Sequence, residues 1–225
     1  INEFMERERH FTRDASHELR SPLTVIQMAS DVLLQGTSLG EPERRAVERI
    51  RRSARDMEEL TSAFLLLARE SEVGLPTETV RINDVVAAEL ERALPLAEGR
   101  PVALQIEARC CLSINAPEKV LSVLIGNLLR NAVAYTNAGR VRVEIQADAV
   151  VIEDTGVGLP AGRIREMGQP FVRGSTGRPG YGVGLTIVRR LSDRFGWPVE
   201  STSQAGVGTR VRITFPGAVA TPLEG

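Results

Sequence analysis

The chain is organised around one stretch near its start, Phe11-Thr12-Arg13-Asp14-Ala15-Ser16-His17-Glu18-Leu19-Arg20-Ser21-Pro22-Leu23. Apolar and small residues recur at helical spacing through this stretch and beyond it, at Thr12, Leu19, Leu23, Ile26, Ser30 and Leu33. At about 100° per residue, His17 falls on the opposite side of this helix, and Ser21 follows one turn later on the same side as His17. The stretch therefore predicts a histidine that projects from a helix surface beside the carboxylate of Glu18.

An exposed neutral imidazole is a nucleophile near physiological pH, and an adjacent carboxylate can hold its tautomer or take its proton. A lone histidine is more often a solvated surface residue. His10 lies one heptad earlier on roughly the same face without a comparable setting, and we assign it no role. His17 differs because of the motifs that follow it in the chain.

The composition is that of an ordinary globular protein. The chain has 225 residues, enough for two modest domains, and 42% of them are hydrophobic and 25% charged. The net charge of −1 indicates neither a nucleic-acid surface nor an anionic-membrane surface. Cys110 and Cys111 are adjacent without metal-ligand spacing, so we interpret them as two reduced thiols. The chain opens without Met in a charged helix and has no membrane-length apolar run, so we expect a fragment of a longer protein.

The first part of the chain predicts a helical hairpin. Residues 1–35 are expected to form one long helix loosened near Pro22, and a second helix is expected to start near Pro42. The second helix carries a heptad seam at Ala46, Ile50, Ser53, Met57, Leu60, Phe64 and Leu67. One hairpin cannot bury such a stripe alone, so we favour pairing with a second copy into a four-helix bundle. The alternative is packing against the following domain of the same chain.

Beyond a hinge at residues 70–76, helices and strands mix without strict alternation. Helices are expected at residues 83–98, 117–135 and 183–195, with Asn83 capping the first and Gly196 ending the last. Strands are expected at residues 79–82, 102–106, 112–114, 141–145 and 150–152, and on both sides of the turn Gly206-Val207-Gly208. Residues 155–182 are rich in glycine and proline and are expected to be a loop. This pattern predicts an α+β fold, an α/β sandwich with helices on one face of a mixed sheet.

Three motifs in this region point to nucleotide chemistry. Asn127 and Asn131 share a helix face, and amide oxygens are suitable ligands for Mg²⁺. Asp154-Thr155-Gly156-Val157-Gly158 ends a strand, where a carboxylate can accept a hydrogen bond from an adenine amino group. Gly180-Tyr181-Gly182-Val183-Gly184-Leu185 leads into a helix whose free N–H groups suit phosphates. Each motif is weak alone, and their combination is specific.

The segment His17-Glu18-Leu19-Arg20-Ser21-Pro22-Leu23 resembles the phosphoacceptor motif of bacterial sensor histidine kinases, and the later asparagine and glycine motifs resemble their ATP-binding domain. The resemblance extends to about Pro216. It implies a dimerisation and phosphoacceptor domain at residues 1–72, an ATP-binding catalytic domain at 77–217 and a tail at 218–225.

The resemblance also implies an activity and partners. A sensor histidine kinase phosphorylates itself with ATP and Mg²⁺ and then transfers the phosphoryl group to an aspartate of a response regulator. It is a homodimer through its helical hairpin. The chain would be the cytoplasmic portion of a protein that upstream segments hold in the bacterial inner membrane.

Residue roles follow from the same resemblance. The catalytic residues would be His17, Glu18, Ser21 and Arg173. Asn131 would bind the metal and Asn127 would support the phosphates. The remaining nucleotide-binding residues would be Tyr135, Asp154, Gly156, Gly158, Gly180, Gly182, Gly184, Leu185 and Thr209.

Two departures from the family pattern affect these roles. Ser21 stands where the family uses Thr or Asn to dephosphorylate its partner, which leaves phosphatase activity open. Ala134 stands where the family often has Lys, so Arg130 or Arg173 has to supply the missing charge.

Two other functions are compatible with a nucleotide-binding fold of this kind. An ATPase or protein-serine kinase on the same fold places a Glu one turn before the metal-binding Asn, where this chain has Asn127. A catalytically silent scaffold would dimerise and bind nucleotide without transfer. The presence of His17, Asn131 and Asp154 argues against the scaffold.

Overall fold

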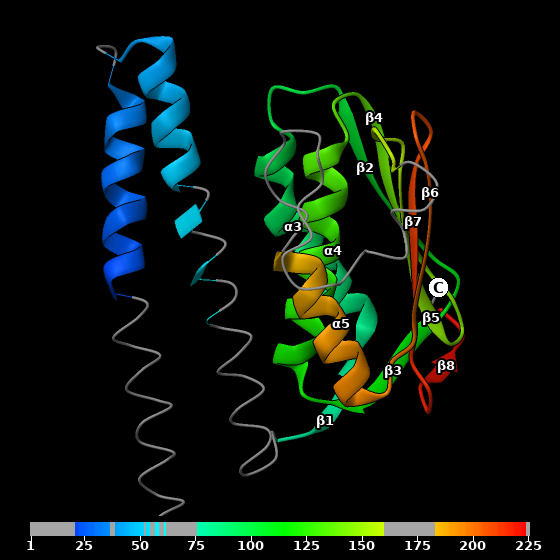
Figure 1. The fold of residues 1–225 in the computed structure, drawn as a ribbon. Coiled ribbons are helices and arrows are strands. Elements are labelled where there is room, and N and C mark those ends of the chain that lie inside the picture. Colours follow the sequence, from blue (N-terminus) through cyan, green and yellow to red (C-terminus); the bar gives the residue numbers. More distant parts are fainter. Residues whose placement is uncertain are drawn as a thin grey trace, which may run out of the picture.

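The computed structural model describes residues 21–36, 39–51, 53–54, 57–58, 61, 76–159 and 183–223. These residues form a pair of helices before residue 62 and an α+β domain from residue 76 onward (Figure 1).

The two helices before residue 62 run antiparallel. Residues 21–35 are helical, and a second run of helical residues begins at residue 41. Gln27 Nε2 donates to Glu58 Oε2 at 2.8 Å, and Arg51 Nη1 donates to Asp31 Oδ1 at 3.1 Å. The earlier position on the first helix pairs with the later position on the second. The described residues therefore confirm the predicted hairpin.

Each helix of the hairpin contacts the other through a narrow stripe. The buried residues of this stripe, a heptad apart on each helix, are Leu23 and Ser30 on the first and Val47 and Ala54 on the second. Two positions of the predicted seam lie off this stripe, since Ile50 is 53% exposed and Met57 is 57% exposed, while Leu60, Phe64 and Leu67 lie outside the described residues. The seam thus needs a surface outside the hairpin to bury it.

The α+β domain contains eight strands and three helices among its described residues, in the order β1 (Glu78–Arg81), α3 (Ile82–Ala97), β2 (Val102–Ala108), β3 (Cys111–Ala116), α4 (Glu118–Tyr135), β4 (Gly139–Ile145), β5 (Ala149–Asp154), α5 (Val183–Phe195), β6 (Val199–Gln204), β7 (Gly208–Thr214) and β8 (Val219–Thr221). The strands form a three-stranded sheet, β1-β3-β8, and a five-stranded sheet, β2-β4-β5-β7-β6. In the larger sheet β2 pairs with β4 in parallel, and the other described pairs are antiparallel.

The helices α3, α4 and α5 lie on one face of the five-stranded sheet (Figure 1). Along β4 the residues Val141, Val143 and Ile145 are at most 1% exposed and point into the core beneath the helices. Side chains alternate along a strand, so Arg140 and Arg142 point to the other face. This arrangement confirms the predicted sandwich with a mixed sheet.

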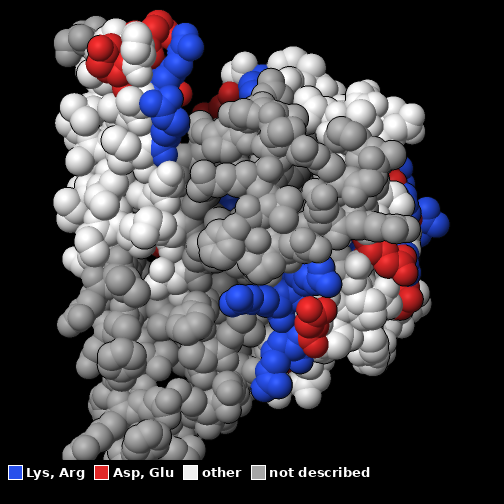
Figure 2. Space-filling model, viewed as in Figure 1, with Lys and Arg blue, Asp and Glu red and all other residues white. Residues whose placement is uncertain are grey.

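The helix α5 agrees with its predicted bounds and shows why its sequence is helical. Ile187, Val188 and Leu191 are buried at helical spacing, while the charged side chains between them are exposed. These charges form a mainly basic group over α5 in Figure 2. Gly196 follows the helix with φ of 66°, a conformation that favours glycine and ends the helix.

Asn83 does not cap α3, contrary to the prediction. The helix begins at Ile82, and its N-cap residue Arg81 makes no side-chain cap hydrogen bond. Asn83 instead donates from Nδ2 to Cys110 O at 2.9 Å and accepts at Oδ1 from Leu112 N at 2.8 Å. It ties α3 to the start of β3, because both backbone groups point toward the helix there.

The strand β8 lies in the segment expected to be a tail. Cys111, Leu112 and Ser113 of β3 pair with residues 219–221, a run too short for its pattern to indicate a strand. Cys110 and Cys111 are both free thiols. Burial, and then the neighbouring Cys111, raises the pKa of the Cys110 thiol.

Candidate functional site

Asp154 ends β5 and points toward the helix layer, on the same face as the buried residues Val150 and Ile152. Its Oδ1 accepts the N–H of Gly156 at 2.9 Å and the N–H of Thr209 at 3.3 Å. Burial raises the pKa of this carboxyl, while the two backbone hydrogen bonds lower it. One oxygen is therefore held by the protein, and Oδ2, which no described residue engages, is available to a donor from a ligand.

A small cavity of about 30 Å³ lies beside Asp154. Residues of α4, β5, α5 and β7 line it, namely Leu128, Asn131, Ala132, Tyr135, Ile152, Asp154, Leu185, Thr209 and Val211. The lining is mostly apolar with a single carboxylate, which suits a flat ring that carries a hydrogen-bond donor. The cavity brings together five of the predicted nucleotide residues, Asn131, Tyr135, Asp154, Leu185 and Thr209.

The two asparagines of α4 meet the start of α5. Asn127 is 2% exposed and donates from Nδ2 to Val123 O at 2.7 Å, so its Oδ1 remains an acceptor. A Cβ at Gly184 would lie 2.8 Å from that oxygen and 3.4 Å from Asn131 Nδ2. Asn131 Nδ2 is buried and has no hydrogen-bond partner among the described residues. An amide oxygen and an unsatisfied amide donor at a glycine fit a Mg²⁺-phosphate group, which offers both a cation and acceptor oxygens.

Two glycines allow the backbone to close around Asp154. A Cβ at Gly156 would lie 2.3 Å from Tyr135 O, and one at Gly208 would lie 1.9 Å from Asp154 O. Gly208 also has φ of 137°, which other residues rarely adopt. Gly158 lies in the turn after β5, two residues beyond Gly156, and packs against Gln204 O. These contacts hold the end of β5 against both α4 and β7.

Arg130 does not supply the charge that is missing at Ala134. A Cβ added at Gly126 would lie 3.1 Å from Arg130 Nη1 and 2.5 Å from Glu89 Oε2, so both side chains lie over this glycine. Glu89 is 5% exposed and also pairs with Arg92. Arg130 is therefore directed toward α3 rather than into the cavity, a placement that the sequence did not indicate.

Several predicted site residues lie outside the described part of the chain, namely His17, Glu18, Arg173, Gly180 and Gly182. Ser21 is helical and exposed at the start of the described hairpin. Sequence reasoning missed the apolar cavity wall formed by Leu128, Ile152 and Val211. The apolar periodicity of α4, β5 and β7 marked these positions as core, but only packing of the layers makes them a cavity wall.

Comparison with known families decides the class of this protein. The family described as "His Kinase A (phospho-acceptor) domain" matches residues 7–72, and "Histidine kinase-, DNA gyrase B-, and HSP90-like ATPase" matches residues 116–219. The chain belongs to the bacterial sensor histidine kinases. In this sensor histidine kinase the first match contains the hairpin, and the second contains α4, α5 and most of the five-stranded sheet.

Individual relatives agree with the family. The kinase is 29% identical over 227 residues to the sensor histidine kinase YkoH of Bacillus subtilis (strain 168), covering 96% of this chain and 49% of YkoH. It is 28% identical over 236 residues to the phosphate regulon sensor protein PhoR of Pseudomonas aeruginosa, covering 100% of this chain and 53% of PhoR. The chain spans about half the length of these curated relatives.

A solved structure of full-length ShkA in complex with AMPPNP is 28% identical to this kinase, with a TM-score of 0.68, and the match covers 95% of this chain and 47% of ShkA. Within the described residues of the kinase, no helix combines the length and apolar character needed to cross a bilayer.

Proposed function

We propose that this sensor histidine kinase phosphorylates itself on His17 with ATP and passes the phosphoryl group to an aspartate of a response regulator. The observation that carries the proposal is the cavity that joins the Asp154 carboxylate to the unsatisfied amide of Asn131. A nucleotide needs both, a partner for the amino group of its base and polar groups for its phosphates. The match of residues 7–72 to a phosphoacceptor domain supports the acceptor.

The amino-bearing edge of the adenine of ATP would enter the cavity and donate to Asp154, with the ring against Tyr135 and Leu185. Thr209, which lines the cavity, and Gly156 and Gly158, in the turn after β5, would complete the base site. Gly180, Gly182 and Gly184 would bring backbone N–H groups to the phosphates at the start of α5.

Asn131 would hold Mg²⁺, and Asn127 would contribute its Oδ1 beside the phosphates. The amide nitrogen of Asn127 is bound to Val123 O, so the oxygen is the group that can serve a ligand. The ion would neutralise phosphate charge, and its contribution would be larger here because Ala134 carries no positive charge.

In the transfer, a ring nitrogen of His17 forms a bond to the γ-phosphorus while the bond to the bridging oxygen breaks and ADP leaves. Glu18 accepts or polarises the proton on the other ring nitrogen, and Arg173 stabilises the transferring group. The phosphohistidine then gives its phosphoryl group to an aspartate carboxylate of the response regulator. Ser21, exposed one turn after His17, offers a hydroxyl that can orient water for dephosphorylation of that partner.

The hairpin supports a homodimer. Ile26 and Leu33 are 40% and 49% exposed on the first helix, as Ile50 and Met57 are on the second at 53% and 57%. Helical spacing places both pairs about 60° from the buried stripe, and the antiparallel orientation puts them on the same side of the hairpin. A second copy would bury this apolar face in a four-helix bundle.

A second apolar stripe lies on the outer side of the first helix. Val25, Met28 and Val32 are 63%, 64% and 70% exposed, and helical spacing puts them on the side of His17 and Ser21. We assign this stripe to the response regulator, which has to approach His17. The relatives are sensor proteins about twice the length of this chain, so we place it on the cytoplasmic side of the bacterial inner membrane as part of a longer sensor.

Labelling with ATP radioactive at the γ-phosphate tests the proposal. His17→Gln is expected to abolish acid-labile labelling while leaving ATP binding unchanged, because His17 belongs to the phosphoacceptor match at residues 7–72 and is not among the residues that line the nucleotide cavity. His10→Gln is the matched control and should keep the label. Acid-labile label on the His17→Gln protein would refute the assignment.

A further inference from the structure

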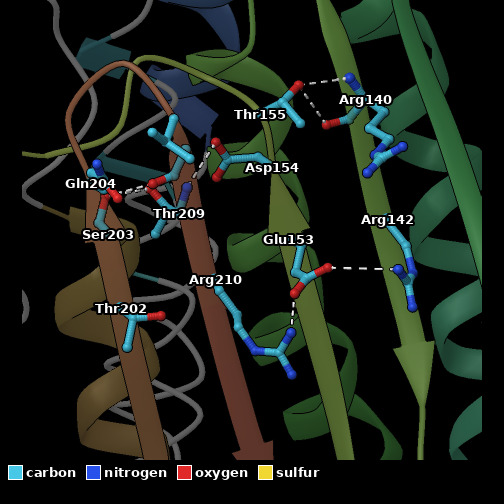
Figure 3. A pocket seen from close by; sticks show the side chains of 12 residues that line it. Arg140, Arg142, Glu153, Asp154, Thr155, Thr202, Ser203, Gln204, Thr209 and Arg210 are labelled. Atoms are coloured by element: carbon cyan, nitrogen blue, oxygen red, sulfur yellow. Dashed lines mark hydrogen bonds and ion pairs between the residues drawn. The ribbon is translucent and has the colours of Figure 1, made fainter.

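The five-stranded sheet has a second face that the helices do not cover (Figure 1). A groove of about 410 Å³ crosses β4, β5, β7 and β6 on this face, near the end of β5 (Figure 3). We call it the outer groove, with the side chains of Arg140, Arg142, Glu153, Thr155, Thr202 and Arg210 around it. Asp154 and Thr209 line both the outer groove and the nucleotide cavity, and strand alternation directs the Asp154 carboxylate toward the helix side.

The strand register explains the shape of the outer groove. One row of side chains consists of Cα partners on four adjacent strands, Arg142, Glu153, Arg210 and Thr202. In the next row Arg140 and Thr155 are neighbours, with the Arg140 N–H donating to Thr155 Oγ1 at 3.0 Å. Gly208 also lines the groove at the start of β7, where a Cβ would lie 1.9 Å from Asp154 O.

Two of the three arginines around the outer groove are paired with carboxylates. Glu153 pairs with Arg210 and lies 3.9 Å from Arg142 Nη1. Arg142 also lies 3.1 Å from Glu107 and 3.2 Å from Glu144, and its buried Nε is out of reach of a ligand. Arg140 is exposed, and no side chain in the described part of the chain forms an ion pair or hydrogen bond with its guanidinium. The groove therefore presents the Arg140 guanidinium to a ligand that carries acceptors.

The span of the groove indicates what kind of ligand fits. Arg140 on β4 and Thr202 on β6 are separated by three strand spacings, about 14 Å at ~4.8 Å per spacing. A phosphate ion or a free amino acid would contact one end only. An extended peptide advances about 3.3 Å per residue, so four or five residues cross the groove.

We propose that the outer groove binds an acidic peptide segment of a partner protein, with a carboxylate against Arg140 and the chain lying across β5 and β7 toward Thr202. A carboxylate matches the guanidinium donors of Arg140. This surface lies on the face of the sheet away from the helices, and none of the described hairpin residues lines it.

Fluorescein-labelled hexaglutamate, titrated into the full 225-residue chain and followed by anisotropy, tests the proposal. We expect saturable binding that Arg140→Gln weakens about fivefold, since an exposed charge pair contributes up to about 1 kcal/mol. Charge reversal with Arg140→Glu is expected to remove the binding. Arg190→Gln removes an exposed arginine from α5, far from the groove, and should leave the affinity unchanged.

Three outcomes would overturn the proposal. The first is that hexaglutamate does not bind. The second is equal binding by the Arg140→Gln and unsubstituted proteins, and the third is equal weakening by Arg140→Gln and Arg190→Gln. Displacement of the peptide by free glutamate or inorganic phosphate at the same total carboxylate or phosphate concentration would show a small-anion site and would also reject the peptide. Retained ATP binding and an unchanged circular dichroism spectrum check that each variant is folded.

Discussion

Asp154 Oδ1 accepts the backbone N–H of Thr209 at 3.3 Å, across the pair formed by β5 and β7. The next residues along these strands, Glu153 and Arg210, pair with each other on the opposite face of the sheet. The same two strands thus hold the Asp154 carboxylate on one face and a wall of the outer groove on the other. Alternation of side chains along a strand makes this double use unavoidable.

Asp154→Asn is expected to weaken ATP binding about tenfold to a hundredfold, because a hydrogen bond to a charged acceptor contributes about 1.5–3 kcal/mol. Titration with a fluorescent ATP analogue measures the change. Asp148→Asn removes an exposed carboxylate that pairs with Arg212 on the same sheet and serves as the control. Equal losses in the two variants would contradict a specific role for Asp154.

ATP affinity is expected to fall with acid at a pH above the usual aspartate range. Burial raises the pKa of Asp154, and only the carboxylate form accepts the amino group, so protonation as pH falls through the raised pKa removes the acceptor. Affinity titrations from about pH 4 to 7 measure this dependence. Asp154→Asn should flatten the curve, and an unchanged curve would argue against the carboxylate.

The raised pKa of Asp154 also makes the free energy of unfolding depend on pH. Because the folded pKa of Asp154 lies above the unfolded value, the group favours folding below the unfolded pKa, and that contribution is lost as pH rises through the folded pKa. Asp154→Asn is therefore expected to stabilise the nucleotide-free protein at neutral pH relative to acid pH. Thermal unfolding at both pH values measures the difference, and destabilisation confined to neutral pH would contradict it.

Gly184→Ala is expected to weaken ATP binding by about tenfold or more while the protein stays folded. The added Cβ would lie 2.8 Å from Asn127 Oδ1, so the amide has to move away from the phosphate site. Isothermal titration with ATP and Mg²⁺ measures the loss. Gly36→Ala is the control, because its Cβ would meet only Leu33 O at 3.4 Å and Val32 O at 4.0 Å, and it should bind ATP normally. Normal ATP binding by the Gly184→Ala protein would contradict a role for this contact in binding.

Ile50→Asp is expected to convert the proposed dimer to a monomer, because it places a charge on the apolar face that spans both helices of the hairpin. Light scattering after size-exclusion chromatography gives the mass. Val32→Asp introduces the same charge at a more exposed site, 70% against 53%, on the outer stripe, and should leave the dimer intact. A dimer in the Ile50→Asp protein, or a monomer in the Val32→Asp protein, would contradict the assignment of the Ile50 face to dimerisation and of the Val32 stripe to the response regulator.

Much of the fold could be predicted because its signals are local. Apolar spacing and Gly196 predicted α5 at its observed bounds, Val183–Phe195, and the turn at residues 206–208 predicted β6 and β7. Asn83 was predicted wrongly because a capping residue and a side chain that bridges to another element have the same local sequence. Its partners lie 27 and 29 residues away, at Cys110 and Leu112.

The amino-acid sequence by itself determined every described element of the α+β domain except β8, together with the histidine motif and the order of the nucleotide motifs, since each depends on residues a few positions apart. Only the tertiary structure decided that Asn131 and Asp154 share a cavity, that Arg130 turns toward Glu89, and that Arg140 stands at a groove. These relationships join residues on different elements. They depend on strand register and on how the helix layer packs on the sheet, which no local pattern specifies.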